Sequence, residues 1–110
     1  MTKVYSKKDK YGNIYWCKEG TNILHREDGP AIEFVDGTKH WYQNDMWHRA
    51  DGPAIENNSG HKEWYQSEKC HRTDGPAVIW PNGDKEYWLN DKPYPNIKTD
   101  EEWIIFQIIN

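Results

Sequence analysis

Three copies of one heptapeptide carry the residue types in this chain that could do chemistry. HREDGPA begins at residue 25, HRADGPA at residue 48 and HRTDGPA at residue 71, so each copy starts 23 residues after the previous one. A histidine, an arginine and a carboxylate at fixed spacing could act in acid–base catalysis or supply metal ligands. The residues concerned are His25, Arg26, Asp28, His48, Arg49, Asp51, His71, Arg72 and Asp74.

The spacing of the copies argues against one shared site. In a stack of β-hairpins, equivalent residues lie two strands apart, about 10 Å. That is too far for three histidines to bind one metal ion, and for the aspartates to act as a close catalytic pair, which needs roughly 5–9 Å. We therefore expect no catalytic, metal-binding or cofactor-binding residue. An enzyme or metal site on a single corner stays open as an alternative.

The heptapeptide is instead predicted to form a structural corner in each repeat. The aspartate is expected to accept backbone N–H bonds, and the glycine to supply an unusual backbone conformation before proline. The histidine ring is expected to pack beneath the corner and bond a carbonyl. The arginine is expected to pair with an aspartate of the same or the next repeat.

The period of 23 extends beyond the corner and predicts the fold class. Each unit contains two short strands, joined at Asp36-Gly37, Ser59-Gly60 and Asn82-Gly83, and such dipeptides are strong hairpin signals. The chain is therefore predicted to be mainly β, an antiparallel meander of stacked hairpin repeats in a single twisted sheet. The aromatic columns of the second strand are Trp41/Trp64/Tyr87 and Tyr42/Tyr65/Trp88.

The C-terminal segment breaks the period. Thr99 and Glu102 have the spacing of a capping box, and an apolar run follows from Trp103. We expect a short, buried capping helix, with a final strand as the alternative. The chain is then one domain, 1–110, made of a degenerate repeat 1–24, repeats 25–47, 48–70 and 71–93, and a cap 94–110.

Composition limits the partners and the compartment. Mean hydropathy is −1.13, yet there are seven Trp and seven Tyr, so a thin aromatic core is expected. The formal charge is −4 without a basic run, which argues against nucleic acid. No apolar run approaches the ~20 residues of a membrane helix, and the N-terminus does not resemble a signal peptide. Cys17 and Cys70 fall in different columns and are interpreted as free thiols in a reducing compartment, so a cytoplasmic location is expected.

The unit resembles the MORN repeat. In WYQNDMWHRADGPAIENNSG, the order Trp41, Asn44-Asp45, His48, Gly52 and Gly60 matches that repeat. The HRxDGPA form departs from it and is similar to divergent MORN-like repeats of phage and giant-virus proteins and of some bacterial antitoxin or immunity proteins. The resemblance covers roughly residues 11–94 and implies an interaction scaffold without catalytic residues.

The two aromatic columns are the candidate partner-binding surface. Adjacent strand residues point to opposite faces, so one column must pack inward with Ile32, Ile55 and Val78 while the other stands on the opposite face. If the outward column is that of Tyr42, it is flanked by His40, Glu63 and Glu86; the alternative is that the stripe is covered by the sheet or by the C-terminal segment. The predicted partner-binding residues are Tyr42, Tyr65, Trp88, Trp41, Trp64, Glu63 and Glu86.

These features predict a non-catalytic protein-binding scaffold, in particular a phage-type inhibitor that blocks a host defence protein. The alternative is an antitoxin or immunity protein that neutralises a co-encoded toxin. Mild acidity permits a basic partner, which would meet carboxylates such as Glu33 and Glu56. An exposed N-terminal edge strand offers a route to a homodimer, although lysines at 3, 7, 8 and 10 look like edge protection.

Overall fold

The protein is a ladder of short antiparallel strands that ends in one helix. The computed structural model describes residues 2–110. The strands are β1 (Val4–Lys8), β2 (Ile14–Lys18), β3 (Ile32–Glu33), β4 (Lys39–His40), β5 (Tyr42–Gln43), β6 (Met46–Trp47), β7 (Ile55–Glu56), β8 (Lys62–Glu63), β9 (Tyr65–Gln66), β10 (Lys69–Cys70), β11 (Val78–Ile79), β12 (Lys85–Glu86), β13 (Trp88–Leu89) and β14 (Lys92–Pro93), and the helix is α1 (Asp100–Ile109). The predicted mainly β, hairpin-stacked fold is confirmed.

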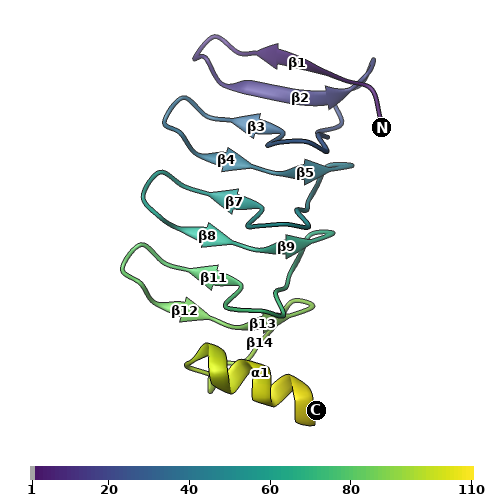
Figure 1. Ribbon diagram of the computed structural model, residues 1–110. Coiled ribbons are helices and arrows are strands. Elements are labelled where there is room, and N and C mark those ends of the chain that lie inside the picture. The colour runs from purple at the N-terminus through teal and green to yellow at the C-terminus, as the bar shows by residue number, and fades with distance from the viewer. Residues whose placement is uncertain (1) are drawn as a thin grey trace.

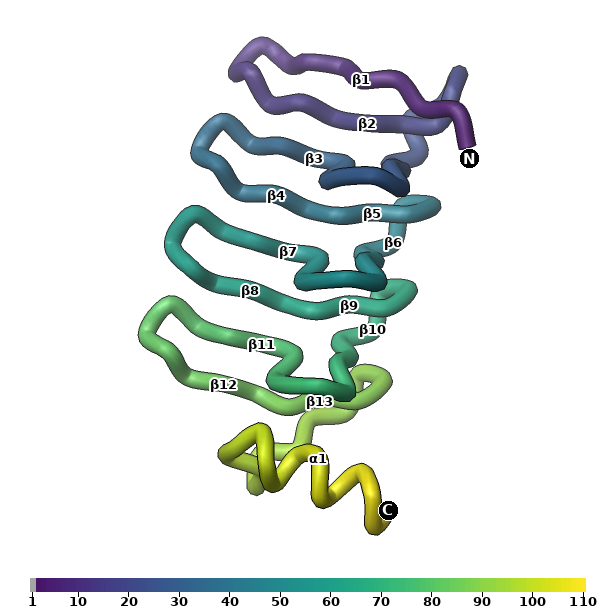
Figure 2. The backbone as a smooth tube through the Cα atoms, viewed as in Figure 1, coloured from purple at the N-terminus to yellow at the C-terminus, as the bar shows by residue number. Residues whose placement is uncertain are grey.

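One open sheet forms the body of the ladder. Its strand order is β1-β2-β3-β4-β7-β8-β11-β12, and each neighbouring pair is antiparallel. Figures 1 and 2 show these strands stacked from the N-terminal hairpin at one end to α1 at the other. The molecule measures 47 × 29 × 18 Å, and its shortest dimension fits a single sheet with side chains and loops on its two faces.

Each repeat contains four short strands, so the expectation of two was wrong. The segment expected to be one strand, TKHWYQ, divides at Trp41 into β4 and β5. Strand β4 pairs within the main sheet, whereas β5 pairs with β6 in a separate two-stranded hairpin. Trp41 lies between them, with its N–H donated to the carbonyl of Ala54 and its own carbonyl accepting from His48. The chain therefore leaves the main sheet at Trp41, and it does so at the equivalent residues Trp64 and Tyr87 in the other two repeats.

The two turns of a repeat have different chemistry. At Asp36-Gly37 the loop is residues 35–37, closed by the Gly37 N–H to the Phe34 carbonyl, with Gly37 at φ 93°. This is a three-residue hairpin loop with glycine at its left-handed position. The two-residue turn with both φ angles positive is Asn44-Asp45, at 52° and 64°, the dipeptide that the resemblance to the MORN repeat matches as a turn.

The middle repeat has the weakest of the two-residue turns. Asp45 and Asp91 each accept a backbone N–H across the stack, from Leu24 (2.7 Å) and Cys70 (2.8 Å). The equivalent turn, Ser67-Glu68, places two residues at φ 47° and 70° without asparagine or aspartate, the side chains that tolerate this region best. Within residues 2–110, Glu68 makes no equivalent side-chain bond to Trp47.

Replacing Ser67 and Glu68 together with asparagine and aspartate is therefore expected to stabilise the protein by about 1 kcal/mol, through reduced backbone strain and one added hydrogen bond. Thermal unfolding should shift upward by roughly 5 °C. The reciprocal control, Asn44→Ser with Asp45→Glu, should lower the midpoint by a similar amount. Unchanged midpoints in both variants would show that turn chemistry does not limit stability.

The helix closes the C-terminal end of the stack. Thr99 is its N-cap and accepts from the N–H of Glu102, whose carboxylate accepts from Thr99 Oγ1 and from the Lys98 N–H. The expected helix is confirmed, but the expectation that it is buried was wrong, because Trp103 is its one buried residue. Trp103 packs against Tyr87 and Tyr94, with ring centroids 5.4 Å away in both cases.

Both cysteines, Cys17 and Cys70, are buried free thiols. Within residues 2–110, no helix has the length and apolar character that crossing a membrane requires.

Candidate functional site

The register of the sheet decides which residues share a face. Directly opposed residues in neighbouring strands point to the same side. The row that runs through Ile32, Ile55 and Val78 also contains His40, Glu63 and Glu86. We call this side the isoleucine face. Alternation along the strands places the column of Tyr42, Tyr65 and Trp88 on the same side.

The other column lies on the opposite side, which we call the arginine face because its rings lie beneath arginines. The guanidinium of Arg49 lies 3.9 Å from the ring centroid of Trp41, and Arg72 lies 4.0 Å from that of Trp64. Tyr87 is covered by Trp103 instead. The arginine-face column is thus covered by the chain itself. The predicted set of partner-binding residues is divided between two faces, so one flat partner cannot contact all of it.

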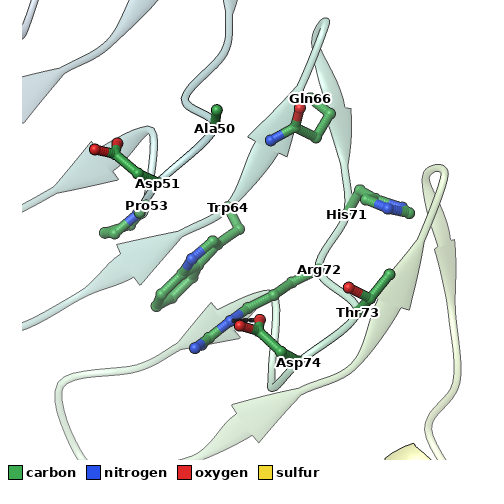
Figure 3. Close-up of a pocket in the computed structure, with 10 residues that line it drawn as sticks. Ala50, Asp51, Pro53, Trp64, Gln66, His71, Arg72, Thr73 and Asp74 are labelled. Carbon is green, nitrogen blue, oxygen red and sulfur yellow. Dashed lines mark hydrogen bonds and ion pairs between the residues drawn. The ribbon is translucent and has the colours of Figure 1, made fainter. Parts of the chain in front are cut away.

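Each corner arginine is held by three kinds of contact. Arg72 Nε donates to Asp74 (2.9 Å), and the guanidinium lies over Trp64 (Figure 3). Arg72 Nη1 also donates to the Pro76 carbonyl (3.1 Å). The same pattern recurs in the other two corners, at Arg26 with Asp28 and at Arg49 with Asp51. The aspartates therefore pair within their own repeat and accept from arginine rather than from the backbone N–H groups that were expected.

The corner glycines are required by space and not by backbone conformation. Gly29, Gly52 and Gly75 are not among the residues with positive φ, contrary to expectation. A Cβ on Gly52 would lie 2.7 Å from Arg49 Cζ, and at the other two corners the distance is 2.8 Å. Glycine allows the guanidinium to reach its position over the tryptophan.

The corner histidines hold the neighbouring hairpin turns. His25 Nδ1 accepts the backbone N–H of Asn44 (3.0 Å), and His48 and His71 accept from Ser67 and Asn90 in the same way. The bond has the opposite polarity to the expected one, in which the ring donates to a carbonyl. An accepting Nδ1 carries no proton, so the hydrogen of the neutral ring lies on Nε2.

Open grooves lie between successive corners on the arginine face. One groove, of about 670 Å³, is lined by residues that include Asp51, Trp64, Arg72 and Asp74 (Figure 3). A similar groove of about 540 Å³ lies one repeat earlier. In the groove of Figure 3, the arginine and the aspartate of the same corner already bond to each other. These grooves follow from the spacing of the corners.

The isoleucine face carries two carboxylates held by ring donors. Glu63 accepts from the Tyr65 hydroxyl (2.6 Å) and bonds His61 Nε2 (2.5 Å). Glu86 accepts from the indole N–H groups of Trp80 (2.6 Å) and Trp88 (3.0 Å). Each carboxylate oxygen has a further lone pair that can accept another bond. Over residues 2–110, no lysine or arginine forms an ion pair with either carboxylate.

The carboxylates of the arginine face differ in this respect. Glu33 lies 3.9 Å from Arg26, and Glu56 lies 3.3 Å from Arg49. The four carboxylates expected to meet a basic partner therefore fall into two classes. The chain pairs Glu33 and Glu56 with arginines itself, whereas Glu63 and Glu86 lie beside aromatic rings without a lysine or arginine partner in residues 2–110.

Rings connect the isoleucine face from one repeat to the next. Trp47 lies between Tyr42 (5.9 Å) and Tyr65 (5.1 Å), and Phe34 contacts His40 at 5.1 Å. Three members, Phe34, Trp47 and Trp80, were missing from the predicted site. Phe34 and Trp80 occupy the same position of the 23-residue repeat, and this match could have identified these two residues from the sequence.

Burial, with the negative charges of this face adding to it, raises the pKa values of two neighbouring groups. Burial raises the pKa of the Cys70 thiol to about 12, and the charges of Glu63, Asp91 and Glu86 add to the effect. Burial and the bond to Glu63 also raise the pKa of Tyr65. Cys70 is therefore a protonated thiol at neutral pH and is not an activated nucleophile.

His40 gives the face a pH dependence. Burial lowers the pKa of His40 below its ordinary value, and the charge of Glu63 opposes part of that effect. The unfolded chain then binds the proton more readily than the folded chain does, so stability is full above the ordinary histidine pKa of about 6.5 and falls as pH decreases through it.

Chemical denaturation at about pH 7.5 and about pH 5.5 should therefore show a loss of stability that is smaller in His40→Gln than in the wild-type protein. Equal losses in the two proteins would assign the dependence to other groups.

The described part of the chain, residues 2–110, contains no group of three or more His, Cys, Asp or Glu side chains placed to hold a metal ion. No family model, curated protein or solved structure matches the chain.

Proposed function

We propose that this chain is a non-catalytic protein-binding scaffold whose isoleucine face docks a partner through basic side chains. The observation that carries the proposal is the pair Glu63 and Glu86. Both accept hydrogen bonds from aromatic ring donors and lack a lysine or arginine partner in the described chain. Aromatic rings are enriched among energetically important interface residues, and complementary charge across an interface sets specificity and the rate of association.

The ladder sets the spacing that such a partner must match. Glu63 lies on β8 and Glu86 on β12, with β11 between them, so the strands that carry them are separated by about 10 Å. Two basic residues seven apart on a helix lie on one side of it and are about as far apart. The partner is expected to present its cations at this spacing.

The proposed consequence of docking is occlusion. A rigid, open sheet that covers a partner's basic surface would block that surface, which is how a phage-type inhibitor of a host defence protein would act. The MORN-like identity itself stays a prediction. A partner encoded beside this chain would point to an antitoxin or immunity protein instead.

The test uses the intact chain immobilised as bait in a lysate of its host cell, with captured proteins identified by mass spectrometry. Glu63→Gln with Glu86→Gln keeps shape and removes two charges, and should weaken binding of the captured partner at least about tenfold.

The matched control is Glu33→Gln with Glu56→Gln, which removes two charges from the arginine face and should leave affinity unchanged. Equal loss in both double variants would point to net charge alone, and unchanged affinity in the first would exclude the isoleucine face as the docking surface. If the wild-type chain retains no protein from the lysate, the proposal is overturned.

A further inference from the structure

The capping helix has an apolar side that is largely exposed. Ile104 and Ile105 are 47% and 51% exposed, and Ile108 and Ile109 are 76% and 74% exposed. These are four of the ten isoleucines of a chain with a mean hydropathy of −1.13. We call them the helix patch.

Closing the stack does not require this patch. The other side of α1 makes the closing contacts, in which Trp103 Nε1 donates to the Arg72 carbonyl (3.1 Å) and the Gln107 amide donates to the Thr73 carbonyl (2.7 Å). Phe106 packs beside Tyr94 at 4.9 Å. Terminal units of repeat proteins ordinarily have a polar outer face, which keeps them soluble. An outer face made of isoleucine therefore indicates a second contact.

The patch has the geometry of a helix-packing surface. Ile104 and Ile108 form one ridge of residues four apart, and Ile105 and Ile109 form the next. Ridges of this kind pack into the grooves of an equivalent helix, crossing it at about −50°. The ridges consist entirely of aliphatic side chains, so the surface that complements them must be equally apolar, and a second copy of α1 offers one.

We propose that two copies of this chain associate end to end through the helix patch. A two-fold axis through the patch makes it contact itself, as symmetric dimers require. The four side chains expose on the order of 400 Å² together, a size at which apolar patches mark interaction sites. Two copies bury on the order of 800 Å², below the roughly 1,000 Å² that a stable specific interface exceeds, so the dimer is weak and populated at micromolar or higher concentrations.

This inference is independent of the proposed function. The patch lies on the helix that closes the C-terminal end, away from the N-terminal edge strand β1, which Figure 1 shows at the opposite end of the stack. It also does not use Glu63 or Glu86. A variant can therefore lose the dimer and keep partner binding, or lose partner binding and keep the dimer.

Sedimentation velocity of the full chain from about 1 to about 300 µM tests the proposal. The wild-type protein should shift from monomer to dimer over this range. Ile108→Glu should stay monomeric throughout, with a dissociation constant raised at least about 30-fold, because the symmetric interface contains the change twice. The control Val35→Glu changes a similarly exposed residue, 68%, in the loop between β3 and β4 and should dimerise like the wild type.

A cross-linking variant gives a positive result that does not depend on the folding of Ile108→Glu. Ile108→Cys should form an intermolecular disulfide on mild oxidation, whereas the wild-type thiols are buried and should not. A wild-type protein that stays monomeric at about 300 µM overturns the proposal. So does a dimer that survives in folded Ile108→Glu, which would direct attention to the edge strand.

Discussion

Gly52→Ala is expected to destabilise the protein by about 1–3 kcal/mol, although the added methyl group is small and the backbone conformation permits it. The new Cβ would lie 2.7 Å from Arg49 Cζ, so the guanidinium must move away. It then loses its place over Trp41 and its bonds to Asp51 and to the Pro53 carbonyl. The expected cost is the value of those contacts.

A double-mutant cycle isolates this cause. Chemical denaturation should show that Gly52→Ala costs about as much as Arg49→Ala, and that adding Gly52→Ala to Arg49→Ala costs less than about 0.5 kcal/mol more. Additive losses would mean that the glycine is required for the backbone instead, and would contradict the structural explanation.

Trp103→Ala is expected to have the largest effect, about 3–5 kcal/mol, because a fully buried indole is removed from the end of the stack. Its ring lies against Tyr87 and Tyr94, and its N–H bonds the Arg72 carbonyl. The helix is only ten residues long, below the length at which isolated helices are stable in water. Without its anchor it should also unfold.

Two measurements check this prediction: thermal unfolding for stability, and circular dichroism near 222 nm for the helix. Ile104→Ala, on the exposed side of the same helix, is the control and should leave the helix signal intact at a few micromolar protein. A helix signal that persists in Trp103→Ala would show that other contacts hold α1 in place.

The sequence was sufficient to predict the stack because its period is strict. Columns such as Asp28/Asp51/Asp74 fix the unit length, and turn dipeptides within each unit predict hairpins. The number of strands was missed because the break at Trp41 depends on which neighbour accepts its backbone bonds. No property of the tryptophan itself reveals that break.

The candidate site was only partly predictable for a related reason. Alternation divides Trp41 from Tyr42 but does not say which of them shares a face with Ile32. That depends on cross-strand register, set by loops of three residues at Gly37 and of two at Asn44. The roles of the corner glycines and histidines were misjudged because both depend on contacts with residues elsewhere in the unit.

The identical corners give the stack a length that can change only in whole units. Trp41 lies beneath Arg49 as Trp64 lies beneath Arg72, at 3.9 and 4.0 Å, so the surface between any two repeats is nearly the same surface. If residues 48–70 were deleted, Trp41 would lie beneath Arg72 in place of Arg49. The chain would shorten by two strand spacings, about 10 Å, and keep both ends. Deletion or duplication of a 23-residue segment would thus change the length of the stack by one repeat without requiring a new kind of interface.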